Sequence, residues 1–284
     1  MRIGFIGAGK VGFTFGRYLV ERNMCVSGYY SQSLRSSKEA AEFTQTRYYE
    51  TLGEIVASSD SLFLTVPDHQ IGKVFSDLRK MNLKDKIICH CSGVLSSGVF
   101  SGIQESGAYG YSIHPIFAVS SKLTSYQDFS NTYFTIEGDE KYLKSMTEFL
   151  KSLGNPVAVI AAEDKAKYHA AAVFASNLVI GLYKQAVGLL EQCQLGEEFS
   201  GKALLPLLQN NVENLVKYGM QDALTGPVER GDAETVRNHL SVLGREERAV
   251  YCLLSEQLLA LAEQKNPKRN YGAIKQLLKE EKLV

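Results

Sequence analysis

The chain opens with a short apolar segment, residues 1–6, that runs directly into three spaced glycines, Gly7, Gly9 and Gly12. Apolar residues recur at helical spacing immediately afterwards. A strand, a glycine turn with this spacing and a helix predict the first unit of a dinucleotide-binding βαβ fold. The first glycine permits the tight turn, the second lets the backbone approach a pyrophosphate, and the third lets the helix pack on the strand. The alternative is a chance turn in a chain that contains 24 glycines.

Strand-like and helical segments alternate along the first 160 residues. The predicted strands are residues 1–6, 24–30, 60–66, 85–93, 108–115, 131–139 and 155–161. After about residue 163 no strand-like run remains, and long amphipathic helical patterns continue to the end. We therefore predict an α/β Rossmann-type domain at residues 1–160, with a parallel sheet and helices on both faces, followed by an all-α domain at residues 161–284.

The first helical pattern of the second domain is unusually long. It spans about 30 residues after residue 163, or roughly 45 Å at the rise of an α-helix. It is apolar on much of its circumference, which predicts a central helix covered on several sides. We expect a second copy of the chain to provide part of that cover, as a homodimer.

Composition argues against several classes of protein. Lys and Arg equal Asp and Glu at 31 each, so the formal net charge is zero, whereas a nucleic-acid or membrane-surface binder would carry a basic excess. No uninterrupted apolar run of about 18 residues is present, so no transmembrane helix is expected. The initial strand leaves no room for a signal peptide. Five scattered cysteines favour reduced thiols in a cytoplasmic protein, and the histidines show no metal-ligand spacing.

The end of the second predicted strand indicates which dinucleotide binds. Residues 30–37 contain serines and Arg35 but no carboxylate before Glu39. NAD enzymes usually place an acidic residue there, whereas hydroxyls and a guanidinium suit the 2′-phosphate of NADP. NADP is therefore favoured over NAD, and the third strand ends in residues that suit an apolar wall for a nicotinamide. The predicted cofactor-binding residues are Gly7, Ala8, Gly9, Lys10, Val11, Gly12, Ser31, Ser33, Arg35, Val66 and Pro67.

Two later strand ends carry residues suited to catalysis. In open α/β sheets the reacting groups gather outside the carboxyl ends of the strands. His114 stands at such an end and is predicted to act as a general acid or base, because an imidazole titrates near neutral pH. Ser92 is predicted to orient the same substrate group. The alternative for His114 is a histidine that anchors a loop, and His90 is interpreted as a core histidine.

One face of the long helix also carries polar groups. Lys165, His169 and Ser176 fall within about 40° of one another on a helical wheel, with Asn177 farther around. Polar groups buried without partners are costly, so we predict that this face lines a cleft and that Lys165, His169 and Asn177 take part in the site. The alternative is that Lys165 is exposed to solvent in the first turn.

A third polar segment follows residue 224. Arg230 lies in a turn rich in glycine and could bind a substrate carboxylate through two of its guanidinium nitrogens. An ion pair between Arg230 and Asp232 that ties the turn together is the alternative. Asp232 itself is predicted to cap the following helix.

Six stretches together carry a family resemblance: GFIGAGKVG, YYSQS, HCSG, IHPIFA, DKAKYHAAAVFASN and LTGPVERGDAETVRNHL. They resemble Rossmann-like proteins whose C-terminal half is a domain of unknown function and whose members are labelled NADP oxidoreductases. The wider group includes pyrroline-5-carboxylate reductases, prephenate dehydrogenases, hydroxyisobutyrate-type dehydrogenases and deazaflavin-dependent NADP reductases. The resemblance implies a helical half that builds the dimer and closes the substrate cleft.

The resemblance to prephenate dehydrogenases implies that Ser92 and the pair His114-Pro115 contact the reacting hydroxyl of a substrate. The glycine expected soon after His-Pro is absent, however, and Lys165 and Asn177 are too far apart for the Lys-x-x-x-Asn pattern of hydroxyisobutyrate-type enzymes. No single relative therefore supplies the substrate.

Together these features predict an oxidoreductase that uses NADP and exchanges a hydride with a small carbonyl or imine metabolite bearing a carboxylate. Two alternatives remain open at this point. One is a non-catalytic NADP-binding sensor or scaffold, and the other is hydride exchange between a nicotinamide and a deazaflavin.

Overall fold

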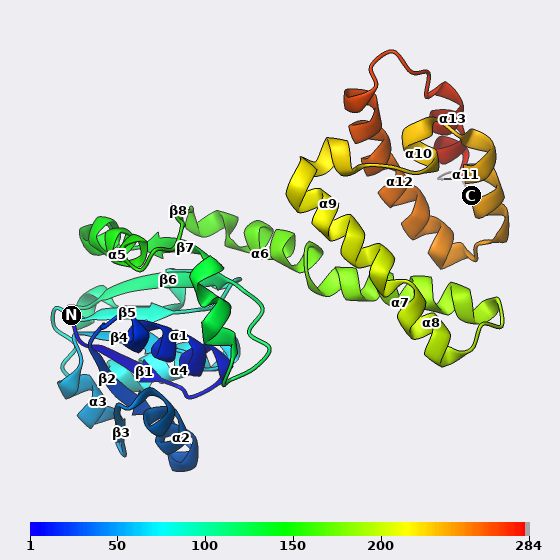
Figure 1. The fold of residues 1–284 in the computed structure, drawn as a ribbon. Helices are drawn as coiled ribbons and strands as arrows, with labels where there is room; N and C mark the ends of the chain where they lie inside the picture. Colours follow the sequence, from blue (N-terminus) through cyan, green and yellow to red (C-terminus); the bar gives the residue numbers. More distant parts are fainter. Residues whose placement is uncertain (282–284) are drawn as a thin grey trace. The chain divides into compact units, whose positions relative to one another are not determined.

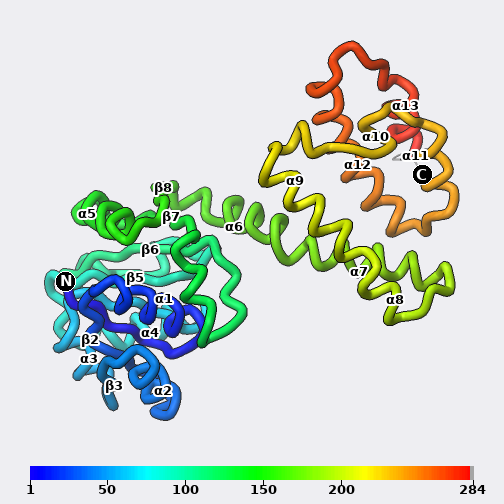
Figure 2. Tube along the Cα trace, viewed as in Figure 1, coloured from blue at the N-terminus to red at the C-terminus, as the bar shows by residue number. Residues whose placement is uncertain are grey.

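The computed structural model describes residues 1–281, which divide into two compact units, residues 1–178 and the described residues from 179 onward. Each unit is described by itself (Figures 1 and 2). The first unit extends past residue 160, the predicted domain boundary, because it includes the helix that follows the last strand.

The first unit contains an eight-stranded sheet in the order β3-β2-β1-β4-β5-β6-β7-β8 (Figure 1). Neighbouring strands are parallel except β6 and β7, which are antiparallel. The predicted Rossmann-type sheet with helices is confirmed, and the short edge strand β3 has no counterpart among the predicted strands. The strands are β1 (Ile3–Ile6), β2 (Val26–Tyr30), β3 (Arg47–Tyr49), β4 (Ser61–Leu64), β5 (Ile87–His90), β6 (Tyr109–Ile116), β7 (Tyr133–Gly138) and β8 (Val157–Val159).

Alternation along the strands separates two apolar cores, one on each face of the sheet. Phe5 and Phe63 point into a core built with α1 and α5, whereas Ile6 and Leu64 point into a core built with α3 and α4. The helices of this unit are α1 (Lys10–Glu21), α2 (Leu34–Thr44), α3 (Leu52–Ser58), α4 (Asp68–Leu78), α5 (Glu140–Ser152) and α6 (Lys165–Phe174). Single 3₁₀ turns are η1 (Ser97–Val99), η2 (Gln104–Ser106), η3 (Ser125–Asn131) and η4 (Ala162–Asp164).

The predicted long helix is interrupted. Helical geometry ends at Phe174 and resumes with α7 at Asn177. The Ser176 hydroxyl donates to the carbonyl of Ala172 at 2.7 Å, an interaction that competes with the helical ladder and bends helices. The chain therefore has two consecutive helices where the apolar pattern alone predicted one.

The run from Ala162 to Gln192 is long and apolar enough to cross a membrane by length and composition, with a mean hydropathy of 1.4 in its most apolar window. The expectation that the chain contains no segment apolar enough to span a membrane is therefore wrong. A single segment of this kind is weak evidence for a membrane span. Its first helix, α6, also begins with Lys165, which is buried and donates to the carbonyl of Ser92 in the first unit.

The second unit is entirely helical among its described residues. Most residues of its apolar core come from α10 to α13, with Val236, Ile274 and Leu278 almost fully buried. Figure 2 traces the chain through α12 to α13, which contacts α11. The helices are α7 (Asn177–Gln192, which begins in the first unit), α8 (Glu197–Ala203), α9 (Leu205–Ala223), α10 (Pro227–Arg230), α11 (Ala233–Val242), α12 (Arg245–Lys265) and α13 (Gly272–Glu281).

Candidate active site

The three glycines after β1 have different roles in the structure. Gly7 has a φ of +107°, and a side chain there would begin 2.7 Å from the backbone of Thr65. A side chain at Gly12 would begin 2.6 Å from the carbonyl oxygen of Gly7. At Gly9 the nearest atom would be 3.7 Å away, which is ordinary contact. Gly7 and Gly12 are therefore required by the fold, whereas Gly9 keeps open the space beside the turn.

A cleft of about 330 Å³ adjoins this turn. Helix α1 begins beside it with Gly9 as N-cap, without a side-chain cap and without an acidic residue in its first turn. The free N–H groups and the positive end of the helix dipole can therefore hold an anion. The residues that line the cleft are Ile6, Gly7, Ala8, Gly9, Tyr30, Ser31, Gln32, Ser36, Leu52, Thr65, Val66, Pro67, Gln70, Val74 and Asp77. The predicted residues Lys10, Val11 and Gly12 are not part of this lining.

Of the three residues predicted to hold a 2′-phosphate, Ser31, Ser33 and Arg35, only Ser31 lines the cleft. The Ser33 hydroxyl instead caps α2 by accepting from the amide of Ser36 at 3.3 Å. The Arg35 side chain is exposed and pairs with Glu39 at 3.0 Å. The segment supplies two lining residues that the prediction omitted, Gln32 and Ser36, although both lie in the same serine-rich stretch.

The hydroxyl of Ser92 is fully engaged by its surroundings. It donates to the carboxylate of Asp68 at 2.7 Å and accepts from the amides of Val94 and Leu95 at 3.3 and 3.0 Å. Asp68 is the first residue of α4, directly after Pro67 of the cleft. These bonds fix the loop after β5 to the start of α4. Asp68 does not cap α4 with its side chain, although it is the first residue of that helix.

Lys165 is buried within the first unit, with 2% of its surface exposed. Its ammonium group donates to the carbonyl of Ser92 at 2.9 Å and to the hydroxyl of Ser112 at 2.8 Å. Burial lowers its pKa, partly offset by the carboxylate of Glu137. The alternative of a solvent-exposed lysine is therefore wrong, because the side chain ties β6 to the residues that follow β5.

Glu137 is a second buried charge in this region that the sequence analysis missed. Its carboxylate accepts from the amide and the hydroxyl of Ser97 at 2.6 and 2.8 Å. It is 5% exposed, and it lies on β7 as part of an unremarkable strand pattern. Glu137 therefore holds the first 3₁₀ turn against the sheet and adds a negative charge near Lys165.

Two imidazoles lie on either side of Gly93. A side chain at Gly93 would begin 2.4 Å from Nδ1 of His169 and 2.9 Å from Nε2 of His114. The two rings are perpendicular, with centroids 6.0 Å apart. Nδ1 of His169 is buried and has no hydrogen-bond partner among the described residues. Both rings therefore pack directly against the backbone of Gly93, where any larger residue would displace them.

Tyr168 completes this group from α6. Its hydroxyl lies 2.7 Å from Nδ1 of His114. Burial lowers the pKa of His114 to about 3, with further lowering from the positive charge of Lys165. The imidazole is therefore neutral at neutral pH. No local sequence pattern connects Tyr168 to His114, because the two residues lie on different elements, α6 and β6.

His90 is a satisfied core histidine, as predicted. Its Nδ1 accepts from the amide of Ser92 at 3.2 Å, and its Nε2 donates to the carbonyl of Ser96 at 3.1 Å. The residue is fully buried. Burial lowers its pKa to about 4.

Acid is expected to destabilise the folded chain below about pH 6.5, the ordinary pKa of an unfolded histidine. The folded-state pKa values of His90 and His114 are about 4 and about 3, so the unfolded chain binds more protons in the interval. The stability that the neutral rings contribute is thus fully present above pH 6.5 and is lost as the pH falls through this window. We expect denaturant titrations to give a free energy of unfolding lower by about 5 kcal/mol near pH 4.5 than near pH 7.5, because each of the two rings contributes about two pH units at about 1.4 kcal/mol per unit. The slope should be shallower in His114→Asn, and an equal slope in that variant would contradict the assignment.

Asn177 is not brought to this cluster. It is exposed, and its side-chain oxygen accepts from the neighbouring Ser176 at 3.2 Å. The helix break before Asn177 changes the angular relation that a continuous helical wheel assumed. Lys165 and His169, on the other side of the break, do face the residues after β5.

Arg230 belongs to the second unit, at the end of α10. Its guanidinium lies 4.0 Å from the carboxylate of Asp232, and its side chain is more than half exposed. Asp232 caps α11 as predicted, accepting from the amide of Thr235 at 3.0 Å.

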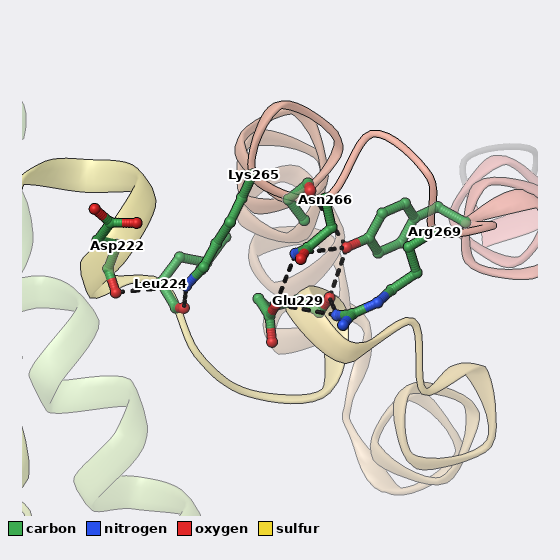
Figure 3. A network of polar contacts seen from close by, with 8 residues as sticks. Asp222, Leu224, Glu229, Lys265, Asn266 and Arg269 are labelled. Atoms are coloured by element: carbon green, nitrogen blue, oxygen red, sulfur yellow. Dashed lines mark hydrogen bonds and ion pairs between the residues drawn. The ribbon is translucent and has the colours of Figure 1, made fainter.

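Figure 3 shows the contacts that hold the segment before Arg230. The carboxylate of Glu229 accepts from Arg269 at 3.0 Å and from Asn266 at 2.8 Å. Lys265 donates to the carbonyl of Leu224 at 2.8 Å. This turn is therefore pinned by the end of α12 and the loop after it, and Glu229 is a structural residue.

Comparison with protein families matches two parts of the chain. Residues 1–115 match the Rossmann-like domain, and residues 132–258 match a domain of unknown function, DUF2520. A search of the curated proteins found no match.

Several solved structures are similar over nearly the whole chain. The protein TM1727 of Thermotoga maritima is 27% identical with a TM-score of 0.73, covering 93% of this chain and 99% of its own. A "putative NADP oxidoreductase" of Bacteroides fragilis is 22% identical with a TM-score of 0.72, covering 92% of this chain and 98% of its own. The pyrroline carboxylate reductase of Plasmodium falciparum, solved with NADP bound, is 15% identical with a TM-score of 0.61, covering 94% and 97%.

These likenesses agree with the fold predicted from the six sequence stretches. The glycine turn, Ser92 and His114 lie in the segment that matches the Rossmann-like domain. Lys165, Tyr168 and His169 lie on α6, in the segment that matches DUF2520. The chain therefore joins a Rossmann-like domain at residues 1–115 to a DUF2520 domain at residues 132–258.

Proposed function

We propose that this protein is an NADP-dependent oxidoreductase that exchanges a hydride with a small carbonyl or imine compound bearing a carboxylate. One observation supports it most. Val66 and Pro67 line the cleft, and the next residue, Asp68, is hydrogen-bonded to Ser92, one residue before Gly93, against which two imidazoles pack. A nicotinamide bound against Val66 and Pro67 would lie near these imidazoles. The printed names of the neighbours, among them a reductase with NADP bound, support the same class.

The cleft fits the proposed cofactor. Bound NADPH would supply the hydride, and its pyrophosphate would lie on the amides at the start of α1, beside Gly9. Ser31 and Ser36 offer hydroxyls beside the end of β2. The carboxylate in the cleft lining, Asp77, lies on α4 and is paired with Lys80 at 2.7 Å. Val66 would provide the apolar wall for the nicotinamide.

The residues around Gly93 would act on the substrate. His114 is neutral, so it would donate a hydrogen bond to the oxygen or nitrogen that gains negative charge when hydride arrives. Ser92 would act through the loop that it fixes, because its hydroxyl is already engaged. Lys165 would hold the ends of β5 and β6 in place and bring a positive charge close to the imidazoles. Participation of Asn177 and carboxylate binding by Arg230 stay predictions.

Cofactor preference gives a direct test of the proposal. Wild-type protein should be stabilised more in thermal unfolding by NADP and NADPH than by NAD, since a ligand that binds the folded state raises its stability. Ser31→Asp places a carboxylate beside the 2′-phosphate and should lower NADPH affinity by about 100-fold. The loss of a charge-assisted hydrogen bond and the added charge repulsion together account for this effect.

Ser145→Asp, at an exposed position of α5, adds the same charge away from the cleft and serves as the control. Equal effects of the two variants would show a general charge effect and contradict the assignment of Ser31. Oxidation of NADPH by members of a panel of small keto and imino acids would then test the reaction. If NADPH binds but no compound in such panels is reduced, the sensor alternative is favoured.

The two alternatives predict different chemistry. A non-catalytic NADP sensor would need no polar groups beside the nicotinamide, and the imidazole pair at Gly93 favours the oxidoreductase over it. Hydride exchange with a deazaflavin would require NADPH to reduce that second cofactor and no small metabolite.

We also propose that the chain forms a homodimer through apolar faces of its C-terminal helices. Ile180 on α7 and Val216 and Met220 on α9 are more than half exposed. Exposed apolar patches of this kind mark interaction surfaces. The oligomeric state in solution and a cytoplasmic location both stay predictions.

A further inference from the structure

The cleft beside the glycine turn has no positive side chain in its lining. Among the residues that the structure describes, those that line the cleft include no lysine and no arginine, and the charged residue among them, Asp77, is negative. A phosphate monoester carries a charge of about −1.5 to −2 at pH 7, and it is bound most strongly by charge-assisted hydrogen bonds. The 2′-phosphate of NADP would therefore draw on a cation from outside this lining.

Arg35 is the cation next to the polar side of this lining. In the chain it stands between Gln32 and Ser36, which both line the cleft, and it belongs to the first turn of α2. Consecutive Cα atoms are about 3.8 Å apart, so rotation about the bonds of the long arginine side chain can bring its guanidinium beside Ser36. The first turn of α2 contains no acidic residue, and the positive end of the helix dipole adds to the attraction for an anion there.

The guanidinium of Arg35 is bound to Glu39, one turn along the same helix. Its Nε donates to the carboxylate at 3.0 Å. The side chain of Arg35 is 89% exposed and that of Glu39 is 45% exposed. Ion pairs of this kind on a helix surface are weak, and exposed side chains change rotamer within nanoseconds. The pair can therefore open at low cost, and Glu39 competes for the guanidinium with any anion beside Ser36.

We infer that Glu39 is a specificity-determining residue: its carboxylate holds Arg35, and the 2′-phosphate of NADP takes the guanidinium from it. The exchange replaces a single hydrogen bond to a carboxylate by a pairing in which the planar guanidinium can bind a phosphate through two N–H groups. NAD has a hydroxyl at that position and would leave the pair between Arg35 and Glu39 intact. The inference rests on the proposed use of NADP, and it adds that two anions compete for one guanidinium.

Isothermal calorimetry with NADP and with NAD tests the role of the guanidinium. Arg35→Gln should lower the affinity for NADP by about tenfold to 100-fold, the range for a hydrogen bond to a charged group, and change the affinity for NAD by less than about twofold. Lys38→Gln is the matched control, because it removes the same charge from α2 and the ammonium group of Lys38 lies 4.9 Å from the ring centre of Tyr48. Equal losses of NADP affinity in the two variants would show a general charge effect and overturn the inference.

Glu39→Gln tests the competition itself. It releases the guanidinium without removing it, so the affinity for NADP should rise by about twofold to fivefold, the worth of an exposed ion pair, while that for NAD stays the same. In the double variant with Arg35→Gln this gain should disappear, because it depends on the guanidinium. Glu42→Gln removes the same charge farther along α2 and should leave NADP affinity unchanged. A gain of equal size in the double variant would show simple repulsion between Glu39 and the phosphate and would overturn the inference.

The exchange can also be followed on the wild-type protein by nuclear magnetic resonance. With ¹⁵N-labelled arginine, the signal that Arg35→Gln removes is the Nε–H group of Arg35. Saturating NADP should shift this signal and NAD should not, and a signal unmoved by NADP would overturn the inference. The proposed function fails in other ways. If neither nucleotide binds, it falls together with the inference, whereas NADP binding with the expected selectivity but without hydride transfer would remove the reaction alone.

Discussion

Gly9→Ala is expected to weaken NADP binding by about 100-fold, the equivalent of one or two charge-assisted hydrogen bonds, without unfolding the protein. The added methyl group meets its nearest neighbour at 3.7 Å, so the fold has room for it. It would stand in the cleft at the N-cap of α1, where the pyrophosphate must approach the backbone amides. Isothermal calorimetry with NADP and NADPH would measure the affinity, and thermal unfolding without ligand would report the stability.

Gly12→Ala is the comparison that separates binding from folding. Its methyl group would begin 2.6 Å from the carbonyl oxygen of Gly7 and 2.7 Å from the hydroxyl of Thr65. Because α1 would have to move away from β1, this variant should lose stability in the absence of any ligand. If Gly9→Ala bound NADP as well as the wild type, the glycine turn would not be the pyrophosphate site.

Gly93→Ala is expected to lower turnover by at least about 100-fold while leaving NADP affinity within about twofold of the wild type, since misplacing catalytic groups by about 1 Å costs this much. The methyl group would begin 2.4 Å from Nδ1 of His169 and 2.9 Å from Nε2 of His114, so both rings must turn aside. The glycine turn and the cleft contain none of these three residues. The measurement is kcat for NADPH oxidation with a reducible compound, beside calorimetry with NADPH.

Gly72→Ala is the matched control for this substitution. Gly72 lies inside α4, and a side chain there would have its nearest neighbour at 3.7 Å. Alanine is favoured over glycine in a helix interior, so this variant should keep full activity and gain slightly in stability. Retained turnover in Gly93→Ala would exclude the two imidazoles at Gly93 from the reaction.

Several features of the site followed from local sequence patterns. The glycine spacing after an apolar run located the turn and the first helix, because the φ angle at Gly7 and the close contact at Gly12 leave no choice of residue. Asp232 was correctly predicted as a helix cap, because capping joins residues three positions apart. His90 was correctly interpreted as a core histidine from its place within an apolar strand.

Other features depended on contacts between distant segments. Ser92 bonds to Asp68 and Lys165 bonds to Ser112, and in neither pair does a local pattern connect the two residues. The helical wheel placed Asn177 with Lys165 only because it assumed an unbroken helix. Local periodicity gives the face of an element, but the partner of a side chain depends on which elements pack against that face.

The sequence by itself determined the alternation of strands and helices apart from β3 and the break before α7, the glycine turn and the absence of a carboxylate at the end of β2, because these depend on backbone geometry and on residues close together in the chain. Only the tertiary structure decided that Lys165 is buried, that Tyr168 holds His114 and that Gly93 separates two imidazoles. These arrangements arise where β5, β6 and α6 meet, and the hydrogen bonds of a buried site are formed between whichever elements the folded core brings together.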